Sequence, residues 1–149
     1  MERRWHGYLL SDEASRLDLE LVWRFLAEEA YWSIGIPRET FERSIRNSLN
    51  FGVYEEASDA QVAFARAVTD RATFAYVGDV FVVPSLRGRG LGHFMIDGLL
   101  AHPDLQGLRQ VLLVTRDAHG LYAKSGFAPL VAPERFMEVR HEAAALYRA

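Results

Sequence analysis

The segment DVFVVPSLRGRGLG, residues 79–92, sets the architecture of this chain. An apolar run typical of a buried strand is followed by Pro84, a glycine-rich turn and the start of an amphipathic helix. Alternating glycines leave main-chain N–H groups accessible, because no Cβ blocks the approach of a ligand. A helix N-terminus also favours an anion through its unpaired N–H donors and its dipole. The segment therefore predicts a phosphate-binding turn, with added positive charge from Arg87 and Arg89. Its glycines are Gly88, Gly90 and Gly92.

The glycine spacing separates this turn from two better-known phosphate-binding turns. A P-loop requires Gly-x-x-x-x-Gly-Lys-Ser/Thr, and the dinucleotide fingerprint requires Gly-x-Gly-x-x-Gly; neither pattern is present here. Arg87, Gly90 and Gly92 instead form Arg-x-x-Gly-x-Gly, after a strand that ends with Val82 and Pro84. This pattern resembles the pyrophosphate-binding signature of the GNAT superfamily of acetyl-CoA-dependent N-acetyltransferases.

Composition narrows the functional classes further. A length of 149 residues predicts one domain, residues 1–149, with a single core. The net charge of −3 argues against nucleic acid as a main partner, since phosphate contacts usually require a basic surface. The chain has no cysteine, which excludes disulfides, a thiolate nucleophile and a cysteine zinc site. No signal peptide, membrane-spanning run or metal-ligand spacing is visible, so we expect a soluble cytoplasmic protein without a metal or membrane partner.

Apolar periodicity predicts an alternation of strands and helices. Helices are predicted from Asp18 to about Ala30, over residues 37–49, from residue 91 to about residue 102, and around Leu121 and Tyr122. Strands are predicted at residues 5–10, 51–54, 62–68, 73–83, 111–114, 127–131 and 136–140. The run 111–114 is apolar throughout, as expected of a central strand buried on both faces. The order indicates an α/β fold with a mixed, largely antiparallel twisted sheet flanked by helices. The GNAT fold has the same order, so the resemblance covers nearly the whole chain.

A second segment, TRDAHGLYAKSGF at residues 115–127, supports the resemblance. Many GNAT members have Asn-x-x-Ala-x-x-Leu-Tyr-x-x-x-Gly-Phe at this place, and Thr115 stands where the asparagine is common. The resemblance implies that Tyr122 protonates the departing CoA thiolate; by itself, Tyr122 would be interpreted as a half-buried helix tyrosine. It also implies that the main chain of Val80 and Val82 binds pantetheine. The pyrophosphate would be held by Arg87, Gly88, Arg89, Gly90, Leu91, Gly92 and His93.

Candidate residues for the acceptor are less sharply defined. Asp79 and Tyr76 lie on the strand that would face an acceptor amine, and Asp79 is costly to bury unpaired. Asp79 is alternatively a residue at a strand distortion whose carboxylate is satisfied by backbone donors. Tyr31 and Trp32 offer aromatic faces that suit a cationic amine, or else they fill the core under the first helix. His119 either hydrogen-bonds the substrate or is a solvated turn residue.

The chemistry expected from the resemblance is direct acetyl transfer from acetyl-CoA to a primary amine. A small or amino-acid-like acceptor is favoured over a protein, on the precedent of the family. The alternatives are a non-catalytic acyl-CoA sensor and a different nucleotide binder; the absence of an acidic ribose-binding residue after a suitable strand argues against the latter. Members of the family are often homodimers, and nothing in the sequence decides this point.

Overall fold

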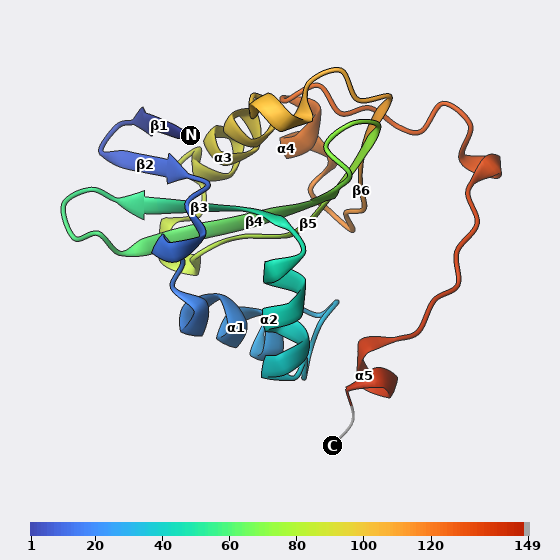
Figure 1. Cartoon of the computed structure of the whole chain (residues 1–149), viewed down its shortest axis with the longest axis horizontal. Coiled ribbons are helices and arrows are strands. Elements are labelled where there is room, and N and C mark those ends of the chain that lie inside the picture. Colours follow the sequence, from blue (N-terminus) through green and yellow to red (C-terminus); the bar gives the residue numbers. More distant parts are fainter. Residues whose placement is uncertain (148–149) are drawn as a thin grey trace.

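One six-stranded sheet runs through the molecule in the order β1-β2-β3-β4-β5-β6 (Figure 1). The structure is a computed structural model that describes residues 1–147. Neighbouring strands are antiparallel except for β5 and β6, which are parallel. This arrangement confirms the expected mixed, largely antiparallel sheet. The strands are β1 (Glu2–Trp5), β2 (Tyr8–Ser11), β3 (Leu49–Glu55), β4 (Gln61–Thr69), β5 (Phe74–Val82) and β6 (Gln110–Leu113).

Helices cover both faces of the sheet (Figure 1). On one face lie α1 (Leu19–Glu28) and α2 (Arg38–Arg46); on the other lie α3 (Leu91–Leu100) and α4 (His119–Ala123). The first helix begins where the sequence predicts, because the Asp18 carboxylate accepts a hydrogen bond of 3.0 Å from the Leu21 N–H. Each helical layer buries its own apolar core against the sheet.

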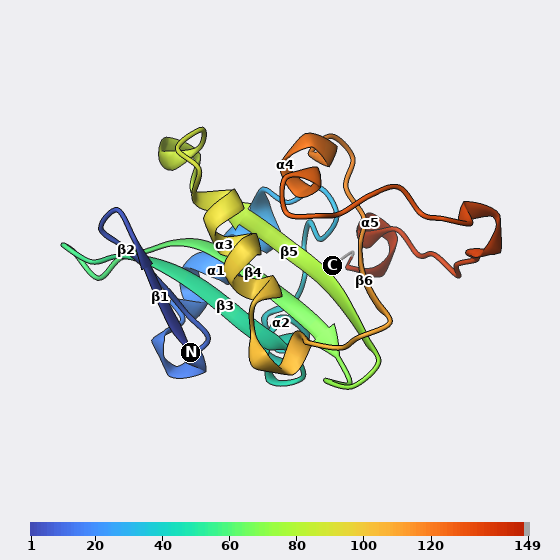
Figure 2. The same ribbon diagram turned by 90° about the horizontal axis from the view of Figure 1, so that it is seen from above.

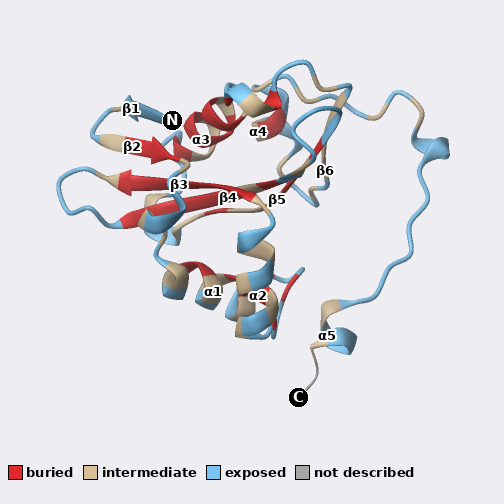
Figure 3. Ribbon diagram, viewed as in Figure 1, coloured by how far each residue is buried: buried red, intermediate tan, exposed pale blue. Residues whose placement is uncertain are grey.

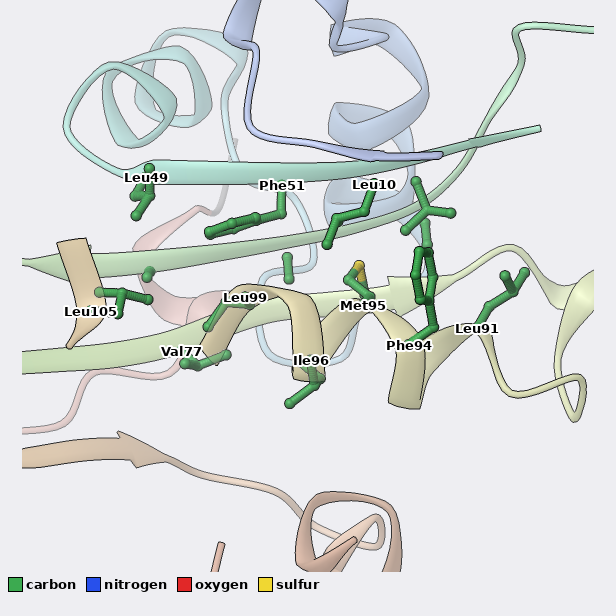
Figure 4. Close-up of a cluster of buried hydrophobic side chains, with 14 of the residues drawn as sticks. Leu10, Leu49, Phe51, Val77, Leu91, Phe94, Met95, Ile96, Leu99 and Leu105 are labelled. Carbon is green, nitrogen blue, oxygen red and sulfur yellow. The ribbon is translucent and has the colours of Figure 1, made fainter. Parts of the chain in front are cut away.

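The larger core lies between α3 and the sheet (Figure 4). Met95 and Leu99 of α3 are fully buried against Leu10 of β2 and Phe51 of β3. At Gly98 the helix lies so close to β2 that an added Cβ would overlap the Leu10 side chain. This close packing positions the N-terminus of α3 at the end of β5.

The sheet is distorted where β5 approaches the glycine-rich turn. Phe64 pairs with Phe81 and Arg66 with Gly78, so two β5 residues, Asp79 and Val80, lie opposite one β4 residue. Asp79 adopts a left-handed conformation with a φ of 54°. Pairing between β5 and β6 runs from Phe74 to Val77 and then ends. The two parallel strands therefore separate beside the bulge.

Four predicted segments differ from the structure. The strand predicted at residues 5–10 is a hairpin, because His6 and Gly7 form a tight turn with positive φ angles. The apolar run 111–114 is not central: β6 is the edge strand, and its residues are half-buried. The segments 127–131 and 136–140 are not strands but extended chain, since no strand lies beside them to complete a hydrogen-bonded ladder within residues 1–147 (Figure 2). A short helix at Pro133–Arg135 interrupts this extended chain, and α5 (Ala143–Leu146) follows it.

Candidate active site

The glycine-rich turn presents a series of unpaired main-chain donors. Gly88 and Gly90 have φ angles of 79° and 86°, and Gly90 is the residue that precedes the first turn of α3. Within residues 1–147, the N–H groups from Gly88 to His93 have no hydrogen-bond partner. These donors belong to an exposed turn and a helix N-terminus, where an anion is favoured. The turn thus has the main-chain chemistry predicted for a phosphate site.

The side chains around this turn differ in their contacts. Arg87 is exposed, and its Nε donates a hydrogen bond of 3.1 Å to the Val82 carbonyl. Arg89 is exposed and forms no ion pair within the described chain. The His93 imidazole lies between Asp97, at 3.2 Å, and the Ser125 hydroxyl, at 3.2 Å. The group of His93 that is free of a partner within residues 1–147 is its main-chain N–H.

Leu91 and Gly92 contribute to the turn in different ways. Leu91 is 1% exposed and anchors the start of α3 in the larger core. A Cβ at Gly92 would lie 3.4 Å from the Leu121 side chain and 3.9 Å from Val82. The first turn of α3 therefore packs against both α4 and the end of β5, which brings the glycine-rich turn and α4 together.

The end of β5 leaves main-chain groups free of the sheet. The Val83 N–H donates to the Val62 carbonyl at 2.9 Å, so the N–H and C=O of the preceding Val82 point away from β4. On that side β6 no longer pairs with β5, and within residues 1–147 the Val82 carbonyl accepts only from Arg87. Val80 lies in the bulge and is half-buried. Val80 and Val82 therefore lie where β5 and β6 are no longer paired, with main-chain groups of Val82 directed away from β4.

Tyr122 is the buried titratable residue of α4. It is 9% exposed, and its ring packs edge-on against Phe127 with 5.9 Å between centroids. Burial raises the pKa of the phenol above its ordinary value of about 10. Tyr122 and the exposed His119 line one groove of about 1070 Å³ beside β6. Thr115, at the asparagine position of the family pattern, accepts the Ala118 N–H at 3.0 Å and so stabilises the start of α4.

Asp79 is held by two side chains from distant parts of the sequence. Its carboxylate oxygens accept hydrogen bonds from Arg66 Nε at 2.6 Å and from Trp32 Nε1 at 2.8 Å. The side chains of Arg66 and Asp79 are 20% and 12% exposed, so this ion pair is largely desolvated. Asp79 does lie at a strand distortion, as the sequence-based alternative expected, but side-chain donors rather than backbone donors satisfy its carboxylate. Arg66 was not identified as a candidate from the sequence. It is the single charged residue in the otherwise apolar strand 62–68, and that property could have identified it.

Aromatic residues and a second arginine extend this cluster. Arg116 lies over the Tyr31 ring at 4.0 Å, and that ring is perpendicular to Trp32 with 5.1 Å between centroids. Tyr31 and Trp32 are 52% and 41% exposed, so they do not fill the core under α1. Burial, and then the charge of Asp79, raise the pKa of Tyr76. Tyr31, Trp32, Tyr76 and Asp79 thus belong to one cluster, whereas His119 lies on the groove with Tyr122. The sequence held no signal for Arg116.

Residues 1–147 hold neither a metal-binding cluster nor a membrane-spanning helix. No group of three or more His, Cys, Asp or Glu side chains in this range is arranged to hold a metal ion. No helix in the same range is long and apolar enough to span a membrane.

Comparison with known proteins places this geometry in a family. Residues 47–129 match the family described as "Acetyltransferase (GNAT) domain". The crystal structure of a "putative acetyltransferase belonging to the gnat family" from Xanthomonas campestris pv. campestris is 44% identical. It superposes with a TM-score of 0.90 over 98% of this chain and 100% of that one. A "predicted acetyltransferase with acetyl-CoA" from Clostridium acetobutylicum shares the fold at 18% identity, with a TM-score of 0.66 over 94% of this chain and 96% of that chain.

One sequence relative has a named acceptor. The chain is 34% identical over 129 residues to "Serotonin N-acetyltransferase 2, chloroplastic" of Oryza sativa subsp. japonica, a match that covers 82% of this chain and 62% of that protein. Together with the structural match from Xanthomonas campestris, these findings confirm the fold expected from the glycine-rich turn.

Proposed function

Since this chain belongs to the GNAT acetyltransferase family, we propose that it moves an acetyl group from acetyl-CoA directly to the primary amine of a small molecule. The observation that carries the proposal is the series of partner-free N–H groups from Gly88 to His93, beside strands that separate after Val77. Any helix leaves its first four N–H groups unpaired; here the preceding turn adds the N–H groups of Gly88 and Arg89 at the same place, and positive-φ glycines leave the donors accessible.

The donor side of the proposed site uses main-chain groups. The N–H groups of the turn hold the pyrophosphate, and the exposed guanidinium of Arg89 adds charge beside them. The main chain of Val80 and Val82 lies along the pantetheine arm in the gap between β5 and β6. Acetyl-CoA supplies a thioester that is already activated, so the protein has mainly to align it with the amine.

Tyr122 supplies the proton that the sulfur needs when CoA leaves. Its raised pKa keeps the phenol protonated at neutral pH, and a protonated phenol can act as a general acid. The packing of α4 against the first turn of α3 holds Tyr122 close to the glycine-rich turn. With no cysteine in the chain, we propose direct transfer without a thiol-bound acyl group.

The acceptor side favours an amine with an aromatic or apolar body. The Asp79 carboxylate accepts two hydrogen bonds and keeps further lone pairs, so it can accept one more from the acceptor amine. Its bonds to Arg66 and Trp32 fix the position of the carboxylate, which suits holding and orienting the amine. The exposed rings of Tyr31 and Trp32 can pack against the aromatic or apolar part of the acceptor. A relative named for the acetylation of serotonin, an aromatic amine, supports this acceptor class.

CoA release tests the proposal directly. Wild type and Tyr122→Phe are assayed with acetyl-CoA and a library of aromatic, aliphatic and amino-acid amines, using a thiol-reactive dye. The absence of cysteine keeps the background low. We expect turnover with an aromatic amine and a decrease of about tenfold or more in kcat for Tyr122→Phe, equivalent to about 1.4 kcal/mol. Tyr8→Phe, a half-buried tyrosine of β2, is the matched control and should keep full activity.

The same experiment separates the alternatives. Tight acetyl-CoA binding without acetylation of any amine or peptide would identify a sensor domain. Absence of acetyl-CoA binding would mean that the turn holds another phosphate. If Tyr122→Phe turns over as fast as wild type, the chain is a transferase but Tyr122 takes no part in its mechanism.

A further inference from the structure

An arginine without a carboxylate partner lies at the edge of the acceptor cluster. Arg116 is exposed and belongs to the segment between β6 and α4, most of which lies at the surface (Figure 3). Its guanidinium carbon is 4.0 Å from the centre of the Tyr31 ring. Within residues 1–147 Arg116 forms no ion pair, whereas Arg66, the other arginine of the cluster, is paired with Asp79 at 2.6 Å. Arg116 therefore brings a positive charge to the cluster that no carboxylate of these residues neutralises.

Arg116 is held in place by its main chain and by its ring partner. The Thr115 hydroxyl accepts the Ala118 N–H at 3.0 Å, and this short-range bond fixes the turn that carries Arg116. A guanidinium that rests on an aromatic face keeps the N–H donors at its edge, and these donors match the two oxygens of a carboxylate. The arrangement is that of an arginine preorganised to bind an anion.

The register of the sheet places Arg116 across the gap from Asp79. The last pair between β5 and β6 joins Val77 to Leu113, and the two strands run in the same direction. Two residues further along each strand, Asp79 and Thr115 occupy corresponding positions on either side of the gap, and Arg116 follows directly. The carboxylate and the guanidinium therefore flank the opening between the strands.

Two aromatic rings lie between these charges. Trp32 donates to the Asp79 carboxylate at 2.8 Å, and its ring is perpendicular to that of Tyr31 with 5.1 Å between centroids. Tyr31 in turn lies under Arg116. The cluster thus has a carboxylate at one end of an aromatic pair and a guanidinium at the other. These charges are complementary to a molecule with an amine at one end and an anionic group at the other.

We propose that Arg116 is a specificity-determining residue that binds an anionic group at the end of the acceptor remote from its amine. The inference rests on the proposed function, since it assigns the amine to Asp79. It narrows the acceptor class to an aromatic amine that carries a carboxylate on its far side. An α-amino acid does not fit, because its carboxylate is next to its amine and would lie beside the Asp79 carboxylate, which repels it.

Two probes that differ only in charge test the inference. In 4-(2-aminoethyl)benzoate a carboxylate is remote from the amine, and in 4-(2-aminoethyl)benzamide a neutral amide of similar shape replaces it. Calorimetry with and without saturating CoA measures their binding and requires no turnover. We expect wild type to bind the benzoate about tenfold more tightly than the benzamide, and Arg116→Met to bind the two equally. Arg109→Met, at an exposed arginine at the other end of β6, is the matched control and should keep the preference.

Four results would overturn the assignment. The first is a wild type that binds neither probe or does not distinguish them, and the second is a preference that survives in Arg116→Met. Equal weakening of both probes would show that Arg116 only packs against Tyr31, and weaker CoA binding by Arg116→Met would place it on the donor side. Binding of phenylalanine that depends equally on Arg116 would refute the remote position of the anionic group.

Failure of the proposed function has a different signature. Wild type would then prefer the benzoate through Arg116 but release no CoA from acetyl-CoA with either probe or with any amine of the library. That result would leave the anion site in place and refute the acetyl transfer. CoA release without any preference for the benzoate would do the reverse.

Discussion

On the donor side of the proposed site the chain presents main-chain N–H groups, whereas on the acceptor side it presents side chains. The two sides meet at the β5 bulge: Val80 and the turn beyond it lie on one side, and Asp79 lies on the other. The donor side depends on backbone conformation, since Gly88 and Gly90 adopt positive φ angles. The acceptor side depends on an ion pair and an indole hydrogen bond at Asp79. Substitutions should therefore affect the two sides separately.

The largest effect is expected from Arg66→Met. The substitution leaves the largely buried Asp79 carboxylate without its counter-charge, and we expect the free energy of unfolding to fall by about 3 kcal/mol. The acceptor kcat/KM should fall about tenfold or more, while the Kd for acetyl-CoA stays within about twofold. Denaturant unfolding, steady-state kinetics and calorimetry measure the three quantities.

Arg24→Met is the control for the loss of an arginine. The Arg24–Glu20 pair is 66% and 53% exposed, so its loss should cost about 0.5 kcal/mol or less and leave kinetics unchanged. Equal losses of acceptor kinetics and acetyl-CoA affinity in Arg66→Met would contradict the separation of the two sides.

Gly90→Ala tests the donor side. A non-glycine residue in the left-handed region costs about 1–2 kcal/mol, and the new Cβ would lie 3.0 Å from the Trp5 ring. We expect the Kd for acetyl-CoA to rise about tenfold, because the strained turn realigns its N–H donors, while the acceptor KM remains unchanged.

Gly107→Ala is the matched control for backbone strain. Gly107 has a φ of 72°, open space around it and a position in the loop before β6. It should lose similar stability without any change in acetyl-CoA affinity. If both variants weaken binding alike, the effect of Gly90→Ala is general destabilisation rather than a loss of the phosphate site.

The two sides also differ in how far the sequence predicts them. Donor-side residues lie within residues 79–92, so their spacing alone predicts the strand, the turn and the helix start. The acceptor side brings together Trp32, Arg66 and Asp79, which are up to 47 residues apart. Sequence patterns identified Trp32 and Asp79 singly but not their hydrogen bond, because that contact depends on how α1 and the following loop pack on the sheet.

The segment after α4 shows that the fold, too, is only partly predictable from sequence patterns. Residues 127–131 and 136–140 have strand-forming sequences, yet such a pattern indicates only the tendency to pair and does not name the partner. The run 111–114 was wrongly placed at the centre of the sheet for the same reason. By contrast, α1 was predicted closely, since its Asp18 cap and its apolar face are local features.

A smaller effect is expected from Trp32→Phe. It keeps an aromatic face but removes one hydrogen bond to Asp79, which should cost about 1 kcal/mol and raise the acceptor KM about fivefold. Trp23→Phe is the control, because its indole donates a bond of 3.0 Å to the Ile36 carbonyl under α1. It should lose comparable stability with an unchanged KM. A KM that rises equally in both variants would show that Trp32 has no specific part in acceptor binding.

The smallest expected effect is a shift in the titration of Tyr76. Burial, and then the negative charge of Asp79, hold the pKa of Tyr76 above its ordinary value of about 10. Asp79→Asn removes that charge and leaves Arg66, which favours the phenolate, so the pKa of Tyr76 should move down. Because the raised pKa stabilises the folded state below pH 10 and this contribution is lost as the pH rises through the folded value, the variant should lose less stability at alkaline pH.

Tyrosinate absorbance against pH measures the shift, with Tyr76→Phe subtracted from wild type and Asp79→Asn/Tyr76→Phe from Asp79→Asn. Tyr122, whose pKa is raised by burial alone, should titrate unchanged in both pairs. A Tyr76 titration that does not move would mean that the Asp79 charge does not reach Tyr76, and that the acceptor side is not one electrostatic unit.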